Sequence, residues 1–374
     1  MRAWCDGMTG YDEAKAMLDG TPQKRAEGIR ILRGLAESGD DRACVLLGNM
    51  YIDGDGVNRN PEEGARFIMA AAGRNDPEGL FSLGMLYEYG DGVQEDLKKA
   101  AEYYEKASEL GSVDAAFALG DLYASGSGVE KDESKAAELY SSAALRGHPE
   151  AQYNMGIIAR HGLAGKDVNY DEAMEWFCRS AESNYAPAQY EIGEMFEKGE
   201  GVNTDMAKAI KWYDLAATNG EPRAMCAIGC MYDEGTELKH DPEKAFEFYL
   251  KAANLGESYA QLNVAQCYIM GNGVKADPEE ALRWYRMSAS QGNPLALGRL
   301  GIMYHDGIGT EADLKMAFEL FEGGADMDDP LSEFMLGKMY EAGEYMDRDP
   351  DKAKELYLRA ADAIPEAKEA AERL

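Results

Sequence analysis

The feature that most constrains this chain is a sequence pattern that recurs every 36 residues. Segments 42–57, 78–93 and 114–129 align without gaps, and each has glycine at its seventh position. One later step is 37 residues long, because segment 161–168 carries a one-residue insertion. Such a fixed period predicts a repeat array of nine units. Their central positions are Gly48, Gly84, Gly120, Gly156, Gly193, Gly229, Ala265, Gly301 and Gly337.

Each unit contains two helical patterns. The first places apolar residues at i, i+4 and i+8, as in Ala115, Leu119 and Tyr123. The second is centred on an aromatic residue about twenty residues beyond the glycine, such as Tyr140, and two small residues follow it. The prolines stand at helix starts, and a Gly-x-Gly-Val turn separates the two helices in several units. Two helices alone cannot bury their apolar faces, so the units must stack into an all-α solenoid.

The combined pattern resembles the Sel-one-like repeat (SLR) family, which is related to the tetratricopeptide repeat. It reads Ala-x-x-x-Leu-Gly-x-x-Tyr, Gly-x-Gly-Val, Asp, Lys-Ala, aromatic, Ala-Ala-x-x-Gly, and it covers residues 41–364. The resemblance implies a right-handed α/α superhelix of about nine 36-residue helix-turn-helix units. It also implies a scaffold for protein complexes, such as an adaptor in degradation or signalling, or a bacterial contact with a host. It does not identify the partner.

Three segments follow from this pattern. Residues 1–40 are expected to form a degenerate N-terminal repeat or cap, with a helix at 25–39, and residues 41–364 form the nine repeats. Residues 365–374 are expected to form a polar capping helix, which the end of a solenoid requires. The fourth unit departs most from the pattern, because it has Ala159 in place of tyrosine and carries the insertion.

The chain is strongly acidic, with a net charge of -31. This charge disfavours nucleic acid and anionic membranes as partners. It has two interpretations: it keeps a long solenoid soluble and monomeric, or it attracts a basic partner. The first residues lack the basic start and apolar run of a secretory signal, and a cytoplasmic location is the expectation.

The cysteines do not recur with the repeat, which argues against a disulfide ladder and favours a reducing compartment. Cys226 and Cys230 lie four residues apart on one helix face, where packing is the favoured interpretation over a metal or redox role. The full set is Cys5, Cys44, Cys178, Cys226, Cys230 and Cys267.

Motifs for catalysis are missing from the sequence. The histidines at 148, 161, 240 and 305 fall in turns or at helix ends, and none forms an HExxH pair. The run Asp53-Gly54-Asp55-Gly56 resembles the start of a calcium loop, but Gly64 stands where the bidentate glutamate belongs. The sequence therefore predicts no catalytic, cofactor or metal site. An enzyme with a site near His161 in the atypical fourth unit is the alternative.

A binding groove is the remaining candidate site. At 100° per residue, two positions of the first helix project away from the core: the second residue after the alanine and the residue after the glycine. Asparagines three residues after the alanine match positions that hold peptide backbones in related tetratricopeptide grooves. Either the aromatics pack between first helices or they line a concave groove. The predicted groove residues are Phe81, Met85, Phe117, Tyr153, Asn154, Ile157, Tyr190 and Asn263.

These features together predict a non-enzymatic scaffold or adaptor that binds a peptide or protein, basic in character, in the concave groove. The alternative within the same fold is a secreted or host-interacting effector. A monomer is the favoured oligomeric state.

Overall fold

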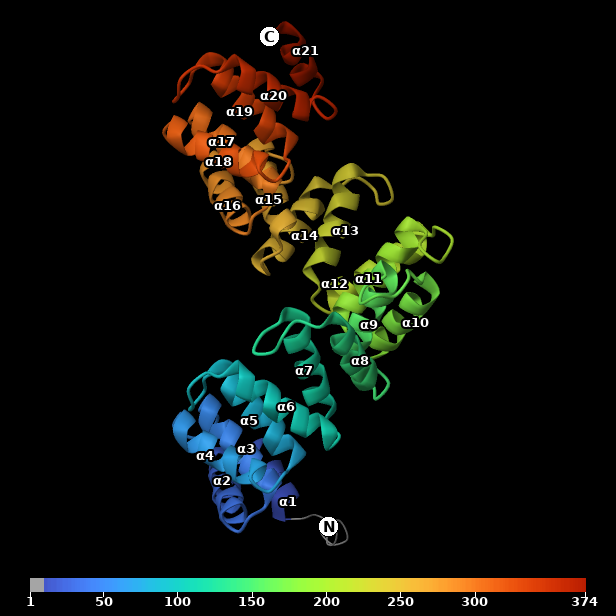
Figure 1. Ribbon diagram of the computed structural model, residues 1–374, viewed down its shortest axis with the longest axis vertical. Helices are drawn as coiled ribbons and strands as arrows, with labels where there is room; N and C mark the ends of the chain where they lie inside the picture. Colours follow the sequence, from blue (N-terminus) through green and yellow to red (C-terminus); the bar gives the residue numbers. More distant parts are fainter. Residues whose placement is uncertain (1–9) are drawn as a thin grey trace. The chain divides into compact units, whose positions relative to one another are not determined.

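The structure is a computed structural model that describes residues 10–374, so Cys5 lies outside the described residues. Every regular element from residue 10 onwards is a helix, and this part of the chain contains no strand (Figure 1). The predicted all-α class and the predicted repeat array are therefore confirmed.

The chain forms two compact units, of which the first ends at Tyr185 and the second begins at Ala186. The helices of the first unit are α1 (Gly10–Leu18), α2 (Pro22–Glu37), α3 (Asp41–Asp53), α4 (Pro61–Ala72), α5 (Pro77–Tyr89), α6 (Leu97–Glu109), α7 (Val113–Ser125), α8 (Glu133–Ala144), α9 (Pro149–His161) and α10 (Tyr170–Glu182).

The helices of the second unit are α11 (Ala186–Lys198), α12 (Met206–Thr218), α13 (Pro222–Glu234), α14 (Pro242–Asn254), α15 (Ser258–Met270), α16 (Pro278–Ser290), α17 (Pro294–Asp306), α18 (Leu314–Ala325), α19 (Pro330–Ala342), α20 (Pro350–Ala360) and α21 (Pro365–Arg373). Within each unit, every helix packs on the next one along the chain, as Figure 1 shows. From α3 to α20, odd-numbered helices are the first helices of their repeats and even-numbered ones are the second.

The third repeat shows how local chemistry sets the helix ends. Gly126 adopts a left-handed conformation with φ 76°, and its amide closes the C-terminus of α7 by donating to the Leu122 carbonyl. Asp132 then caps α8 by accepting from the Lys135 amide at 2.9 Å. Between them, a Cβ on Gly128 would lie 2.4 Å from the Leu97 carbonyl carbon, so only glycine permits this approach to the preceding repeat.

The core of a repeat is an aromatic ring packed on the central glycine. In the third repeat, the Tyr140 ring of α8 lies on Gly120 of α7, where a Cβ would be 2.7 Å from Tyr140 Cε1. The hydroxyl passes beyond the glycine and donates to Asp121 Oδ1 at 2.7 Å. Burial is the main cause that raises the pKa of Tyr140 above its ordinary value. The glycine and the aromatic therefore act as one packing unit.

Helices α1 and α2 form a pair before the first full repeat, and α21 follows the last one. Helix α21 packs on α20 and buries Ala367, Ala370 and Ala371, while Arg373 Nη2 donates to Glu341 Oε1 at 2.7 Å. None of the helices in residues 10–374 combines the length and the apolar character that crossing a bilayer requires.

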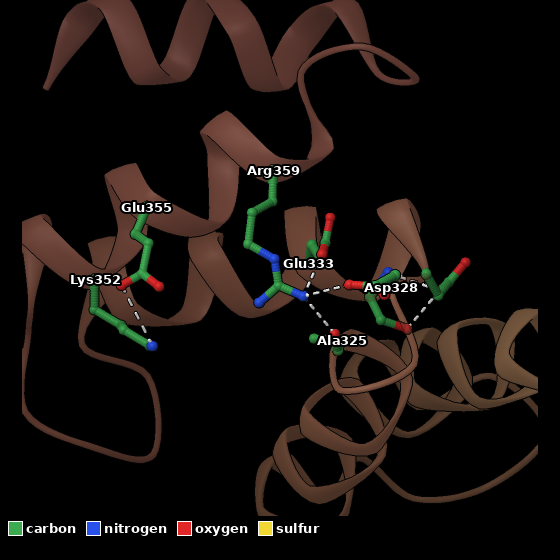
Figure 2. Close-up of polar contacts among 8 residues, drawn as sticks. Ala325, Asp328, Glu333, Lys352, Glu355 and Arg359 are labelled. Carbon is green, nitrogen blue, oxygen red and sulfur yellow. Dashed lines mark hydrogen bonds and ion pairs between the residues drawn. The ribbon is translucent and has the colours of Figure 1, made fainter.

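A charged cluster joins the eighth and ninth repeats (Figure 2). Arg359 Nη2 of α20 lies 2.6 Å from Glu333 Oε1 and donates to the Ala325 carbonyl at 2.7 Å and to Asp328 Oδ1 at 3.1 Å. The Glu333 side chain is 4% exposed, and its burial raises the pKa of this carboxyl although Arg359 lowers it. Arg359 thus compensates a buried charge at a contact between repeats.

Candidate binding groove

Four pockets recur at one register of the repeat, two in each unit. They lie between successive first helices: α3 and α5, α7 and α9, α13 and α15, and α15 and α17. The intervening second helix lines three of them as well, through Tyr140, Tyr249 and Tyr285. Each is lined by the residues two before, one after and two after the central position of the later helix. These residues are Ser82, Met85 and Leu86; Asn154, Ile157 and Ile158; Asn263, Gln266 and Cys267; and Arg299, Ile302 and Met303. We call the pockets at this register, taken within each unit, the groove.

The size of the pockets decides what they can hold. Their volumes are about 260, 280, 80 and 120 Å³ in chain order. Pockets that hold whole small molecules usually measure roughly 300–1,000 Å³. The groove pockets suit single side chains of a polypeptide instead. A wider hollow of about 810 Å³ lies apart from the groove, over the turn that includes Gly199 and Asp205.

The chemistry of the pockets differs along the row. The first, the acidic pocket, contains Asp53 and Asp91. The second, the apolar pocket, is lined by Ile157 and Ile158 and closed by Leu163 and Ala164, which belong to the inserted turn of the fourth repeat. In the third pocket, Asp233 accepts a hydrogen bond from the Asn272 amide at 2.7 Å, and the fourth combines isoleucines with Arg299. A shared register thus presents a different surface at each repeat.

Half of the predicted groove residues line these pockets. Met85 lies in the acidic pocket and Asn263 in the third pocket. Asn154 and Ile157 come together in the apolar pocket, beside Tyr140. A contact between these residues and a partner stays a prediction.

The other four predicted groove residues are aromatic, and they do not line these pockets. Their rings are half-buried, and each packs on the core aromatic of its own repeat. Within each unit, the first helix packs mainly on its own second helix and on the second helix of the preceding repeat. This packing explains the apolar rings without a ligand. The ring pairs are Phe81–Tyr104 at 5.7 Å, Phe117–Tyr140 at 5.8 Å, Tyr153–Phe177 at 5.9 Å and Tyr190–Tyr213 at 5.4 Å.

The ring of Phe117 offers a direct test of this packing. It also stacks on His148, the cap of α9, with ring centroids 4.5 Å apart. We expect Phe117→Ala to lower the free energy of unfolding by about 1–2 kcal/mol, less than for a fully buried phenylalanine. The measurement is urea denaturation followed by circular dichroism, with Met85→Ala as the smaller-effect control. An unchanged midpoint for Phe117→Ala would leave the ring free to serve as a ligand contact.

Several groove residues were not found from the sequence. Ser82 shares its register with Asn154 and Asn263, and Asp91 stands between the two glycines of a turn. Ser82 could have been found by reading, in every repeat, the position that asparagine occupies in the fourth and seventh repeats. Leu163 and Ala164 carried no such signal, because the insertion interrupts the repeat alignment.

The two cysteines of α13 lie beside the third pocket. Asn263 Nδ2 donates to Cys226 Sγ at 3.7 Å and to Cys230 Sγ at 3.9 Å. Hydrogen bonding from the Cys226 thiol is the main cause that lowers the pKa of Cys230, while burial opposes the shift. All five cysteines of the described residues are free, and no three His, Cys, Asp or Glu side chains in residues 10–374 could hold a metal ion.

The histidines serve local roles where their contacts are given. His148 Nδ1 accepts from the Ala151 amide at 3.2 Å at the start of α9. His240 Nδ1 lies 2.7 Å from the Asp233 carbonyl oxygen, and His305 Nε2 lies 2.9 Å from Glu344 Oε2. His161 is exposed at the end of α9.

The stacked helix pairs and the recurring register define an α-solenoid repeat protein. The chain belongs to the Sel1 repeat family, which matches it nine times. The matched residues are 41–75, 77–112, 113–148, 149–185, 186–221, 222–257, 258–293, 294–329 and 330–363. Sel1 repeat proteins are in general non-catalytic scaffolds for protein–protein interaction.

Two solved structures illustrate the similarity. A protective antigen of uropathogenic Escherichia coli that displays an SLR fold is 27% identical, with a TM-score of 0.71, covering 97% of this chain and 78% of the other. A Sel1 repeat protein from Oxalobacter formigenes is 33% identical, with a TM-score of 0.59, covering 79% of this chain and 85% of the other. Comparison with the curated proteins gives no match.

Proposed function

We propose that this protein is a non-enzymatic scaffold that holds a partner polypeptide along the groove. The observation that carries the proposal is the row of side-chain-sized pockets at one register of the repeat. An extended ligand can place its side chains into the pockets within one unit. Their number and their different chemistries then supply affinity and specificity.

The charge of the protein favours a basic ligand. The net charge is -31, and carboxylates line two of the pockets: Asp53 and Asp91 the first, and Asp233 the third. Long-range attraction raises the association rate of an oppositely charged partner, whereas buried apolar contacts slow its release. The acidic excess therefore raises the association rate of the partner, and the apolar pocket lowers its dissociation rate.

Binding kinetics of a captured partner test the proposal. We expect a rise from 0.05 to 0.3 M salt to lower the association rate at least threefold, because exposed charges are screened beyond about 10 Å near 0.1 M salt. Ile157→Ala is expected to raise the dissociation rate several-fold, because it removes the wall of the apolar pocket. The control is Leu145→Ala, at an exposed residue that ends α8. If salt and Ile157→Ala both leave the rates unchanged, the partner does not bind in the groove.

A host-facing role is the second candidate, because the similar E. coli protein is described as a protective antigen. The free cysteines of the described residues favour a reducing compartment, and we propose that the protein is located in the cytoplasm. Fractionation of the source cells decides between them. A chain found in the cytosol supports the scaffold, and a chain found in the medium supports the host-facing role.

A further inference from the structure

We propose that the acidic pocket between α3 and α5 is the anchor site for a long basic side chain of the partner. This inference rests on the proposed function and assigns a ligand chemistry to one pocket of the groove. The pocket measures about 260 Å³ and combines two carboxylates with apolar walls. A lysine side chain has the matching parts, an ammonium group on an alkyl stem.

The electrostatics of the pocket favour a cation. Asp53 is the last residue of α3 and Tyr89 the last of α5, so two helix C-termini meet at the pocket with their negative dipole ends. Asp53 has no ion pair or hydrogen bond among the described side chains. Asp91 Oδ1 lies 3.6 Å from Arg59 Nη2, but both side chains are well exposed, and such pairs contribute little. The nearby Arg25 is paired with Asp55 outside the pocket.

The walls of the pocket suit the stem of a basic side chain. Ile52 and Met85 line the pocket and are only half-buried, so they can cover methylene groups. The Tyr89 ring stands at the rim with 68% of its surface exposed. An ammonium or guanidinium group close to such a ring gains a further cation–π attraction.

The Ser82 hydroxyl is a second observation, because Ser82 lines the pocket and its hydroxyl has no partner in residues 10–374. Ser82 is 1% exposed, and its Oγ has no hydrogen-bond partner in the described part of the chain. A buried hydroxyl without a hydrogen-bond partner is destabilising. An ammonium group has three donors and no acceptor, so its chemistry matches a lining of carboxylates and a hydroxyl.

The third pocket provides an internal comparison at the same register. Asn272 there corresponds to Asp91, since both stand seven residues after the central position, and Asn263 corresponds to Ser82. The Asn272 amide donates to Asp233, and the Asn263 amide donates to two cysteine sulfurs. That pocket supplies its own donors and measures only about 80 Å³. The acidic pocket has a carboxylate and a hydroxyl in place of the two amides, and besides Asn49 its lining offers mainly acceptors to a ligand.

Methyl NMR of the full chain tests this assignment. Methionines are labelled at the methyl carbon, and the Met85 signal is assigned with Met85→Leu. The probe is the capped peptide Ac-Ala-Lys-Ala-NH2, and the matched probe has norleucine in place of lysine. We expect the lysine peptide to shift the Met85 signal in a saturable way, with at least fivefold weaker binding of the norleucine peptide. Equal shifts by the two peptides, or no shift by either, would overturn the assignment.

Substitutions identify the groups that hold the cation. Asp53→Asn and Asp91→Asn are each expected to weaken the lysine peptide at least fivefold, and Asn is tolerated in the turn because Asn272 occupies the equivalent position. Asp55→Asn removes the same charge outside the pocket and should change binding less than twofold. Equal losses from all three would mean attraction to the acidic surface in general and would refute the pocket. If the lysine peptide does not bind, but salt and Ile157→Ala change the kinetics of the partner as expected, only the assignment of the acidic pocket is refuted. If the peptide binds, but salt and Ile157→Ala leave the kinetics of the partner unchanged, the scaffold proposal is refuted.

Discussion

Gly120→Val is expected to lower the free energy of unfolding by roughly 2–4 kcal/mol, because a branched side chain must enter an occupied space. A Cβ at this position would lie 2.7 Å from Tyr140 Cε1 and 2.9 Å from Tyr140 Cδ1. The ring cannot move away easily, because Asp121 accepts a hydrogen bond from its hydroxyl and Phe117 packs beside it. The repeat must therefore open locally to admit the new side chain.

Gly34→Val is the matched control for this prediction. Gly34 lies inside α2, and a Cβ there would have no neighbour within 4 Å. Valine has a higher helix propensity than glycine, so the control should be neutral or slightly stabilising. Urea denaturation followed by circular dichroism compares the midpoints of both variants with the parent. Similar midpoints for Gly120→Val and the parent would contradict the role of the glycine as a packing surface for the aromatic.

Arg359→Ala is the second large effect, with an expected loss of about 2–3 kcal/mol. The substitution leaves the carboxylate of Glu333 buried without its compensating charge, which is costly in a protein interior. It also removes a hydrogen bond to the Ala325 carbonyl of the preceding repeat. Lys352→Ala is the control in the same helix, because the Lys352–Glu355 pair is exposed and spans 3.5 Å (Figure 2). Its removal should cost less than about 0.5 kcal/mol. Equal losses of stability from Arg359→Ala and Lys352→Ala would contradict the role of Arg359 in compensating the buried carboxylate of Glu333.

The loss caused by Arg359→Ala should depend on pH. Burial raises the pKa of Glu333, and Arg359 opposes this shift, so the substitution raises the pKa further. When a carboxyl has a raised pKa in the folded state, the free energy of unfolding of the protein falls as pH rises through that pKa. It recovers as pH falls again. The difference between variant and parent should therefore be largest at pH 7 and shrink towards pH 5. A constant difference across this range would show that Glu333 is not the group responsible.

The sequence predicted the repeat and its helices well, because their signals are local and recur. The 36-residue spacing, the proline positions and the paired glycine and aromatic each indicate the same helix pair. The predicted groove residues remain a prediction as contacts of a partner. A helical wheel identifies the side of one helix that faces away from its own core, and Met85 and Ile157 on that side line pockets. It does not show that the core aromatic of the second helix reaches this side, where Phe117 packs on Tyr140 and Tyr153 on Phe177. The role of Asp91 could not be predicted, because its place depends on stacking between repeats.

Photo-crosslinking at defined positions tests the scaffold account most directly. Benzoylphenylalanine is placed at Met85 or Ile157 in the groove, and at Leu145 or Leu255, which are exposed at the ends of second helices. Circular dichroism confirms that each variant folds. The crosslinks are made in native lysate, with and without an excess of the parent protein that lacks benzoylphenylalanine. The account predicts that the two groove positions capture the same protein, that excess chain competes for it, and that the second-helix positions do not capture it. Capture from Leu145 and Leu255 with none from Met85 or Ile157 would contradict it.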